Sequence, residues 1–267
     1  MAIKIDSASN EKIKYLSKLA SSSKFRKENG EFFLEGLRLC YDAVLSEIRI
    51  TAVYYTEKAY EKSAKEIEQI VSKSDLAYLI SESVSEKITQ TKNSQGVFCK
   101  CTFVKDSGKD RIDPTKKYVA LDNVQSPDNL GAVSRTAEAL GISGLIISSG
   151  CDIYNPKAQR AAMGSLLRLP VIKTDNLSSL ILSLKENGMK VYATTPDANA
   201  KKITETDMSG GVVCVIGNEA NGISDEVFGV CSKITIPMKG RAESLNAAMA
   251  ASITMWEMMR KEQVTVD

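Results

Sequence analysis

Histidine is absent from the 267 residues of this chain. Imidazole is the commonest general base near neutral pH and the commonest neutral metal ligand, so any general base or metal ligand in this chain must come from another residue type. The six cysteines include no C-x-x-C pair, and several of them lie in apolar segments, as reduced core cysteines do. We therefore expect no metal site, and a protein that resides in a reducing compartment.

Long apolar runs are absent as well. No segment approaches the roughly 18 consecutive apolar residues of a membrane-spanning helix. The N-terminal stretch MAIKIDSASN has no apolar core of the kind that secretory signal peptides carry. Together these absences predict a cytoplasmic protein with no membrane partner.

Glycine-rich phosphate loops are a third absence. No predicted strand is followed by G-x-G-x-x-G, and the chain has no Walker A lysine loop. Nicotinamide-dependent dehydrogenases, P-loop NTPases and ordinary Rossmann-type methyltransferases therefore lose their main sequence support.

The net charge of +2 is too close to zero to identify a partner, but the charge is unevenly distributed. Between Lys4 and Glu28 there are seven basic residues against three acidic ones. Such a stretch is either a face for nucleic-acid phosphates or a solvated helix surface, and the segment alone does not decide between them.

Strands and helices alternate in two stretches of the chain, and hydrophobic residues make up 43% of the whole, as in ordinary globular proteins. Residues 1–104 predict a small α/β domain without any catalytic pattern of its own. The polar segment 105–117 is interpreted as a linker. Residues 118–267 predict a mostly parallel sheet with helices on both faces, including one helix from Asn155 through Leu167.

Three polar loops follow predicted strands of this second domain, and the carboxyl ends of strands are where parallel α/β sheets bind ligands. They span residues 123–131, followed by Arg135; 216–224, with Glu219 at the tip; and 236–246. Each loop alone has an ordinary explanation. Ser126 or Asp128 can cap a helix, and Arg135 and Glu219 can be solvated charges.

The last helix, from about Leu245 to Arg260, is apolar nearly all round. A helix of this kind needs enclosure on most of its sides, either by its own domain or by a partner subunit.

Taken together, the three loops resemble the three motifs of the SpoU/TrmH family of RNA 2′-O-ribose methyltransferases, within the SPOUT superfamily. The first matches N-x(4)-D-N-x-G-x(3)-R from Asn123 to Arg135, the second G-x-E-x-x-G from Gly217 to Gly222, and the third I-P-M…S-L-N-x-A from Ile236 to Ala248. The FFLEG-x-R-L run of residues 32–39 is similar to the family's N-terminal substrate-binding domain, a small RNA-binding fold that resembles a ribosomal protein.

This resemblance implies a trefoil knot in the C-terminal domain, whose crevice holds S-adenosylmethionine largely through main-chain groups and without a metal. The residues implied for cofactor binding are Thr194, Thr195, Gly217, Ile236, Met238 and Leu245. The residues implied for catalysis are Arg135, Asn129, Glu219, Ser244 and Asn246.

Arg135 is implied to contact the ribose hydroxyl or the neighbouring phosphate, and a role as base is one reading. Because the pKa of arginine exceeds about 12, we prefer a role in which Arg135 stabilises developing alkoxide charge and orients the phosphate. The other four residues would position Arg135 and the target nucleotide.

The resemblance further implies a homodimer through the C-terminal domain, with an active site shared between subunits. The presence of the N-terminal domain favours ribosomal RNA over transfer RNA as the substrate. Two alternatives from other classes are a non-catalytic RNA-binding protein and a small-molecule α/β enzyme. The first does not require the three loops, and the second does not explain the N-terminal domain.

Overall fold

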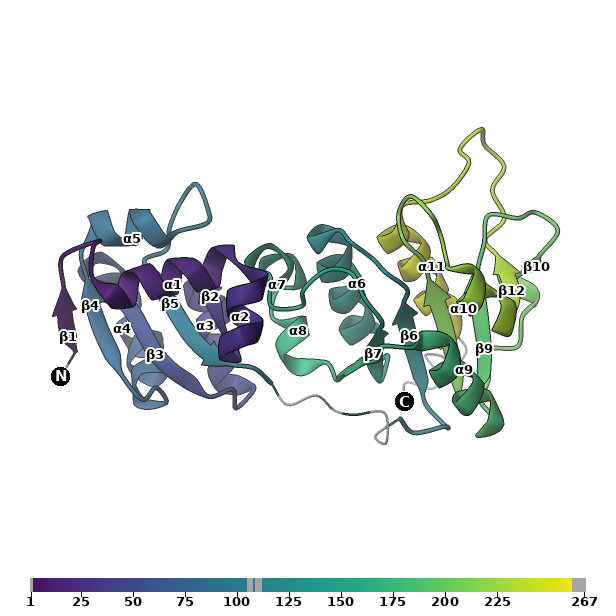
Figure 1. The fold of residues 1–267 in the computed structure, drawn as a ribbon, viewed down its shortest axis with the longest axis horizontal. Coiled ribbons are helices and arrows are strands. Elements are labelled where there is room, and N and C mark those ends of the chain that lie inside the picture. The colour runs from purple at the N-terminus through teal and green to yellow at the C-terminus, as the bar shows by residue number, and fades with distance from the viewer. Residues whose placement is uncertain (1, 105–107, 109–111, 261–267) are drawn as a thin grey trace. The chain divides into compact units, whose positions relative to one another are not determined.

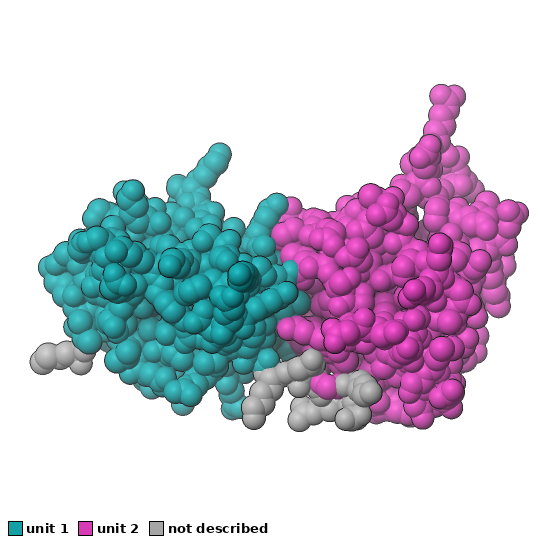
Figure 2. Space-filling model, in the orientation of Figure 1, with its two compact units in different colours: residues 1–105, 152–168 teal, residues 106–151, 169–267 magenta. Residues whose placement is uncertain are grey.

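The computed structural model of the chain describes residues 2–104, 108 and 112–260. The chain forms two compact units, one of residues 1–105 and 152–168 and the other of residues 106–151 and 169–267 (Figure 2). Within the described ranges, no helix is long and apolar enough to cross a membrane.

The first unit contains a five-stranded sheet in the order β1-β4-β3-β5-β2, in which β5 runs antiparallel to β3 and β2 (Figure 1). Its strands are β1 (Ile3–Ile5), β2 (Glu31–Glu35), β3 (Ile50–Thr56), β4 (Ala77–Ile80) and β5 (Val97–Thr102). Its helices are α1 (Glu11–Ser21), α2 (Ser23–Asn29), α3 (Leu37–Leu45), α4 (Glu57–Ser72), α5 (Glu82–Ile88), α7 (Pro156–Ala162) and α8 (Ser165–Arg168). The short edge strand β1 was not predicted from the sequence.

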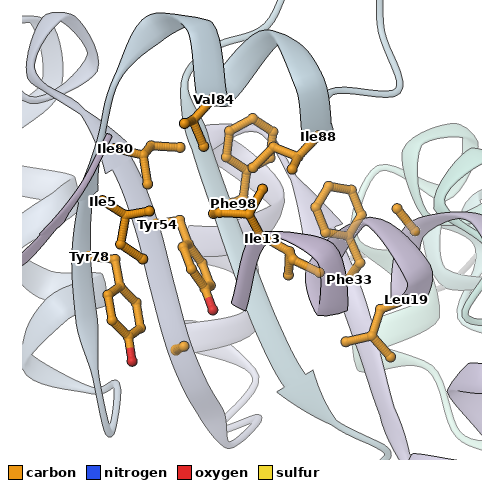
Figure 3. Close-up of a cluster of buried hydrophobic side chains, with 13 residues drawn as sticks. Ile5, Ile13, Leu19, Phe33, Tyr54, Tyr78, Ile80, Val84, Ile88 and Phe98 are labelled. Carbon is orange, nitrogen blue, oxygen red and sulfur yellow. The ribbon is translucent and has the colours of Figure 1, made fainter. Parts of the chain in front are cut away.

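One face of this sheet is covered by α1 and α5, and their apolar residues build a buried cluster with the strands (Figure 3). Helical spacing places Ile13, Leu16 and Leu19 of α1 on one side, facing Phe33 and Phe98 of the sheet. Helices α3 and α4 pack against each other and against β3, β4 and β5. Their buried residues do not belong to the α1 cluster, so they cover the opposite face.

The second unit contains a seven-stranded parallel sheet in the order β10-β12-β9-β11-β6-β7-β8. Its strands are β6 (Lys117–Leu121), β7 (Gly144–Ile147), β8 (Val171–Lys173), β9 (Lys190–Thr194), β10 (Lys201–Lys202), β11 (Val212–Ile216) and β12 (Ser232–Thr235). Its helices are α6 (Pro127–Leu140), α9 (Leu177–Glu186), α10 (Asp225–Val230), α11 (Ala247–Met259) and the 3-10 helix η2 (Ile203–Glu205). The central strands β6 and β11 are buried at every position, as expected for a sheet covered on both faces.

Residues 152–168 group with the first unit, although the expected catalytic domain of residues 118–267 included them. Several contacts hold them there. The ring of Tyr154 stacks on Phe103 with 4.0 Å between centroids, and the Arg26 guanidinium lies 2.8 Å from the Asp152 carboxylate. The assignment of RNA binding and catalysis to separate domains stays a prediction, and the expected linker lies partly outside the described residues.

The single helix expected from Asn155 through Leu167 is wrong, because the structure divides it into α7 and α8. The backbone turns left-handed at Met163 (φ 52°) and Gly164 (φ 87°), which ends α7.

Candidate active site

The three polar loops follow β6, β11 and β12, and they meet at the carboxyl edge of the parallel sheet in the second unit. The loops that follow β6 and β11 are joined directly, because the Asn218 side-chain amide donates a 2.8 Å hydrogen bond to the backbone oxygen of Asn123. Asn123 itself adopts a left-handed conformation (φ 56°), which asparagine tolerates better than most residues. The parallel order of the sheet therefore gathers side chains that lie far apart in sequence.

The Gly217–Gly222 loop is a tight, pre-organised turn. Asn218 and Gly222 exchange two backbone hydrogen bonds of 2.9 and 3.0 Å, and the Asn218 side chain accepts bonds from the backbone of Ala220 and Asn221. A Cβ at Gly217 would lie 2.3 Å from the carbonyl carbon of Gly222, so no other residue fits there without movement. The turn thus fixes where Glu219 is presented.

The Glu219 carboxylate ties this turn to the start of α6. One of its oxygens accepts from the Asn129 amide at 2.7 Å and from the Ser126 backbone at 3.0 Å, and the other accepts from the Gln125 backbone at 3.1 Å. Burial alone would raise the pKa of Glu219, but the hydrogen bonds from Asn129 and from backbone N–H groups outweigh it and lower this pKa below its ordinary value. Glu219 is therefore held as a carboxylate.

The third loop joins the same network through Asn246. The Asn246 amide donates to Asn129 at 3.1 Å, while its own oxygen caps α11 by accepting from the backbone of Ala248 and Met249. Asn246, Asn129 and Glu219 thus form a continuous chain of side-chain hydrogen bonds across all three loops.

A cavity of about 500 Å³ opens beside this network. Its walls include all six residues expected for cofactor binding: Thr194, Thr195, Gly217, Ile236, Met238 and Leu245. Glu219 and Ser244 line it too. The charged residues among its described lining are the acidic Glu219, Asp225 and Glu243, with no lysine or arginine, so the cavity favours a ligand that carries positive charge.

Arg135 stands apart from this cavity wall. It lies on the exposed side of α6 and forms no hydrogen bond or ion pair with the part of the chain that the structure describes. Its side chain is therefore available to a ligand. The structure brings Asn129, Glu219 and Asn246 together and places Ser244 at the cavity, but it does not place Arg135 in that network. The catalytic and cofactor-binding roles of all these residues stay predictions.

Comparison with known proteins decides the family. Residues 116–256 match the model of the SpoU rRNA Methylase family, and residues 10–99 match that of the MRM3-like substrate binding domain. The chain belongs to the SpoU rRNA methylase family. It is therefore an RNA methyltransferase.

Two of the relatives of this SpoU methylase match nearly its whole length. The 23S rRNA (guanosine(2553)-2′-O)-methyltransferase RlmP of Bacillus subtilis (strain 168) is 30% identical over 95% of this chain and 98% of its own. An AdoMet-bound rRNA methyltransferase from Sinorhizobium meliloti is 30% identical, with a TM-score of 0.87 over 97% of this chain and 98% of that chain. A TrmH/SpoU tRNA modifying enzyme from A. aeolicus is also 30% identical, but matches only 56% of this chain with a TM-score of 0.51.

Sequence reasoning missed Asp122, which joins the loops that follow β6 and β11. Its buried carboxylate accepts two 2.8 Å bonds from Ser224, one from the backbone and one from the hydroxyl, and a 3.3 Å bond from Ser148. Ser224 does begin α10, as expected, but its hydroxyl points to Asp122 instead of capping the helix. The available signal was an acidic residue directly after a buried strand.

The described residues contain no group of three or more histidine, cysteine, aspartate or glutamate side chains placed to hold a metal ion.

Proposed function

We propose that this SpoU methylase transfers the methyl group of S-adenosylmethionine to a ribose 2′-hydroxyl of ribosomal RNA. The observation that carries the proposal is a cavity with an acidic lining between the second and third loops, which hydrogen bonds through Asn129 join to the first loop. S-adenosylmethionine supplies a methyl group already activated by the positive charge of its sulfonium. An acidic cavity beside polar loops fits such a cation, and Gly217 leaves its backbone open to close approach.

The work left to the protein is to place the ribose hydroxyl in line with the methyl group and to stabilise the charge that develops on its oxygen. Positioning alone can supply much of the acceleration. Arg135 is unpaired within the described residues, so its guanidinium can hold the developing alkoxide and the adjacent phosphate in a fork of donors. Hydrogen bonds among Glu219, Asn129 and Asn246 hold the three loops together.

We also propose that the C-terminal region is knotted and that it forms a homodimer. For the dimer, α11 supplies the support: Met249, Ile253 and Trp256 follow a helical spacing on one side of the helix and are 54%, 41% and 51% exposed. Large apolar side chains grouped on one helix face are typical of a protein interface. For the knot, the support is family membership. A location in the cytoplasm stays a prediction.

Ribosomal RNA is favoured because the B. subtilis relative, which matches both halves of this chain, is named a 23S rRNA 2′-O-methyltransferase. The test is to incubate the purified protein with S-adenosylmethionine labelled in its methyl group and with unmodified 23S rRNA, 16S rRNA or bulk tRNA. Alkaline hydrolysis then identifies the modified nucleotide, because a 2′-O-methyl group protects the adjacent phosphodiester bond. Protection in 23S or 16S rRNA alone supports the proposal. Label in tRNA alone, or on a base, contradicts it.

A further inference from the structure

The basic stretch that the sequence singled out spans β1, α1 and α2, and the basic residues of the two helices divide into two kinds. Arg26 is buried and bound to Asp152, so it is unavailable to a ligand. The five lysines of these helices are exposed. Lys14 and Lys24 have carboxylate partners, while Lys12, Lys18 and Lys27 form no ion pair within the described residues.

Two of these unpaired ammonium groups lie over aromatic rings. The Lys12 nitrogen lies 5.7 Å from the centroid of Tyr78, and the Lys18 nitrogen lies 5.7 Å from that of Phe25. Attraction between a cation and a ring face at this distance restricts where the long side chain points. Lys12 and Lys18 are therefore held at defined positions along α1, about 9 Å apart along its axis at 1.5 Å per residue.

Two tyrosine side chains lie on the face of the sheet that α1 covers, beside Lys12. Tyr54 of β3 and Tyr78 of β4 stack at 4.9 Å, and their side chains are only 3% and 2% exposed. Figure 3 shows both hydroxyls pointing the same way, away from Val84 and Ile88 of α5. Neither hydroxyl has a hydrogen-bond partner among the described residues, and neither is among the enclosed polar atoms left unsatisfied, so each oxygen retains some contact with solvent.

Glu31, an acidic residue close to these tyrosines, is already compensated. Glu31 accepts a 2.7 Å hydrogen bond from Tyr15 and forms a 3.0 Å ion pair with Lys100. The Lys100 nitrogen also lies 5.2 Å from the centroid of the Tyr15 ring. Burial raises the pKa of Tyr54, and electrostatic interactions with Tyr78, Glu31 and Tyr15 add to the effect, so the Tyr54 hydroxyl keeps its proton and can donate a hydrogen bond. The surface therefore presents cations and neutral donors to an anionic partner.

We propose that this surface, made of Lys12, Lys18 and the hydroxyls of Tyr54 and Tyr78, binds the phosphate backbone of the RNA substrate. Ammonium and tyrosine hydroxyl groups are standard phosphate contacts in nucleic-acid interfaces. Base reading is not expected here, because the two tyrosine rings are buried and offer no face on which a base can stack. The inference rests on the proposed function for the identity of the RNA and adds which face of the substrate-binding unit holds it.

The experiment compares two double variants of the full chain, Lys12→Gln/Lys18→Gln and Tyr54→Phe/Tyr78→Phe. The matched control is Lys62→Gln/Lys65→Gln, which removes two exposed lysines from α4 on the opposite face of the sheet. Binding to unmodified 23S rRNA is measured over a range of salt concentrations, and S-adenosylmethionine binding is measured by calorimetry as a check on folding.

The lysine variant should bind RNA about tenfold more weakly near physiological salt, with a salt-dependence slope reduced by about 1.4 to 1.8, since each lost phosphate contact contributes about 0.7 to 0.9. The tyrosine variant should lose affinity a few-fold with an unchanged slope, because its lost donors are neutral. The control should match the wild type. Wild-type RNA affinity in either double variant overturns the proposal.

Failure of the proposed function gives a different result. In that case the wild-type protein does not methylate ribose in ribosomal RNA, whatever the salt slopes of the variants are.

Discussion

The side-chain amide of Asn129 donates a 2.7 Å hydrogen bond to the carboxylate of Glu219, a residue 90 positions away in the sequence. Asn129 in turn accepts a 3.1 Å bond from Asn246. Because these residues belong to three separate loops, the shape of the cavity depends on long-range contacts, and Glu219 is the acceptor that most of them share.

Glu219→Gln should lower kcat/KM at least about tenfold, corresponding to ~1.4 kcal/mol. The substituted amide keeps the shape of the side chain but loses the charge that three donors now bind. Since the pKa of Glu219 is lowered in the folded protein, its contribution to stability is complete above the ordinary pKa of 4.5 and is lost as pH falls through the lower folded value. The difference in melting temperature between wild type and variant should thus stay constant above pH 4.5 and narrow below it.

The control is Glu226→Gln, which removes an exposed carboxylate from the first turn of α10. It should leave kcat/KM unchanged. A difference between wild type and Glu219→Gln that already narrows near neutral pH would show that hydrogen bonds do not hold the carboxylate ionised.

Gly217→Ala and Gly222→Ala separate steric from conformational demands in the same turn. At Gly217 the added carbon meets backbone atoms at 2.3 and 2.4 Å, whereas at Gly222 it meets open space and only the left-handed φ of 71° is strained. Gly222→Ala should therefore cost about 1–2 kcal/mol of stability. Gly217→Ala should displace the turn and lower S-adenosylmethionine affinity more than tenfold, as measured by calorimetry. Equal effects of the two substitutions on cofactor affinity would refute this account.

Trp256→Glu should convert the proposed dimer into monomers, because it places a charge in the exposed apolar face of α11. Sedimentation velocity at micromolar concentration measures the change. Leu182→Glu is the matched control: Leu182 is a large apolar residue of α9 with 47% exposure, and α9 packs with α10 rather than with α11. A wild-type protein that sediments as a monomer, or a dimer that survives Trp256→Glu, would contradict the proposed interface.

Arg26→Ala should destabilise the first unit by about 3–5 kcal/mol, since it leaves the carboxylate of Asp152 without the guanidinium that it binds through two nitrogens. Adding Asp152→Asn should restore part of the loss, and chemical denaturation of the four proteins in the cycle gives the coupling. If the two substitutions change the free energy of unfolding additively, the pair contributes little to holding residues 152–168. A truncation that removes residues 1–104 is a poor test of domain function, because it uncovers Tyr154 and Asp152.

The strand and helix alternation predicted most of the fold because its signals are local. Buried runs such as 212–216 and Gly141 at the end of α6 identify their elements without knowledge of the rest of the chain. The break between α7 and α8 was missed. Gly164 was an available signal, whereas the left-handed conformation of Met163 before it carries none. The attachment of residues 152–168 to the first unit was missed too, because it depends on partners such as Arg26 more than a hundred residues away.

The candidate site was predictable to the extent that its residues belong to motifs. The six residues expected for cofactor binding all line one cavity, yet motif spacing indicates neither the chain from Asn246 to Glu219 nor the contact between Asp122 and Ser224. Those contacts arise only when the parallel sheet brings the ends of β6 and β11 together.

Arg135 offers the sharpest test of the chemistry. Its side chain is exposed and has no partner among the described residues, so replacing it should leave folding and S-adenosylmethionine affinity within a few-fold of the wild type. Arg135→Ala should nevertheless reduce methyl transfer by ~10²–10³ or more, the usual cost of losing a donor that stabilises developing negative charge. Lys201→Ala, which removes another exposed cation of the same unit, should have no such effect.

Arg135→Lys distinguishes a specific fork of donors from a general positive field. Lysine keeps the charge but offers a single ammonium group, which cannot hold the hydroxyl and the phosphate together in fixed geometry. We expect single-turnover methyl transfer by this variant to stay at least about tenfold slower, equivalent to ~1.4 kcal/mol of lost transition-state stabilisation. Full activity of the lysine variant on its natural RNA would mean that only positive charge is needed at this position. In that event the catalytic role proposed for Arg135 would have to be withdrawn, while the loop network around Glu219 would stand unaffected.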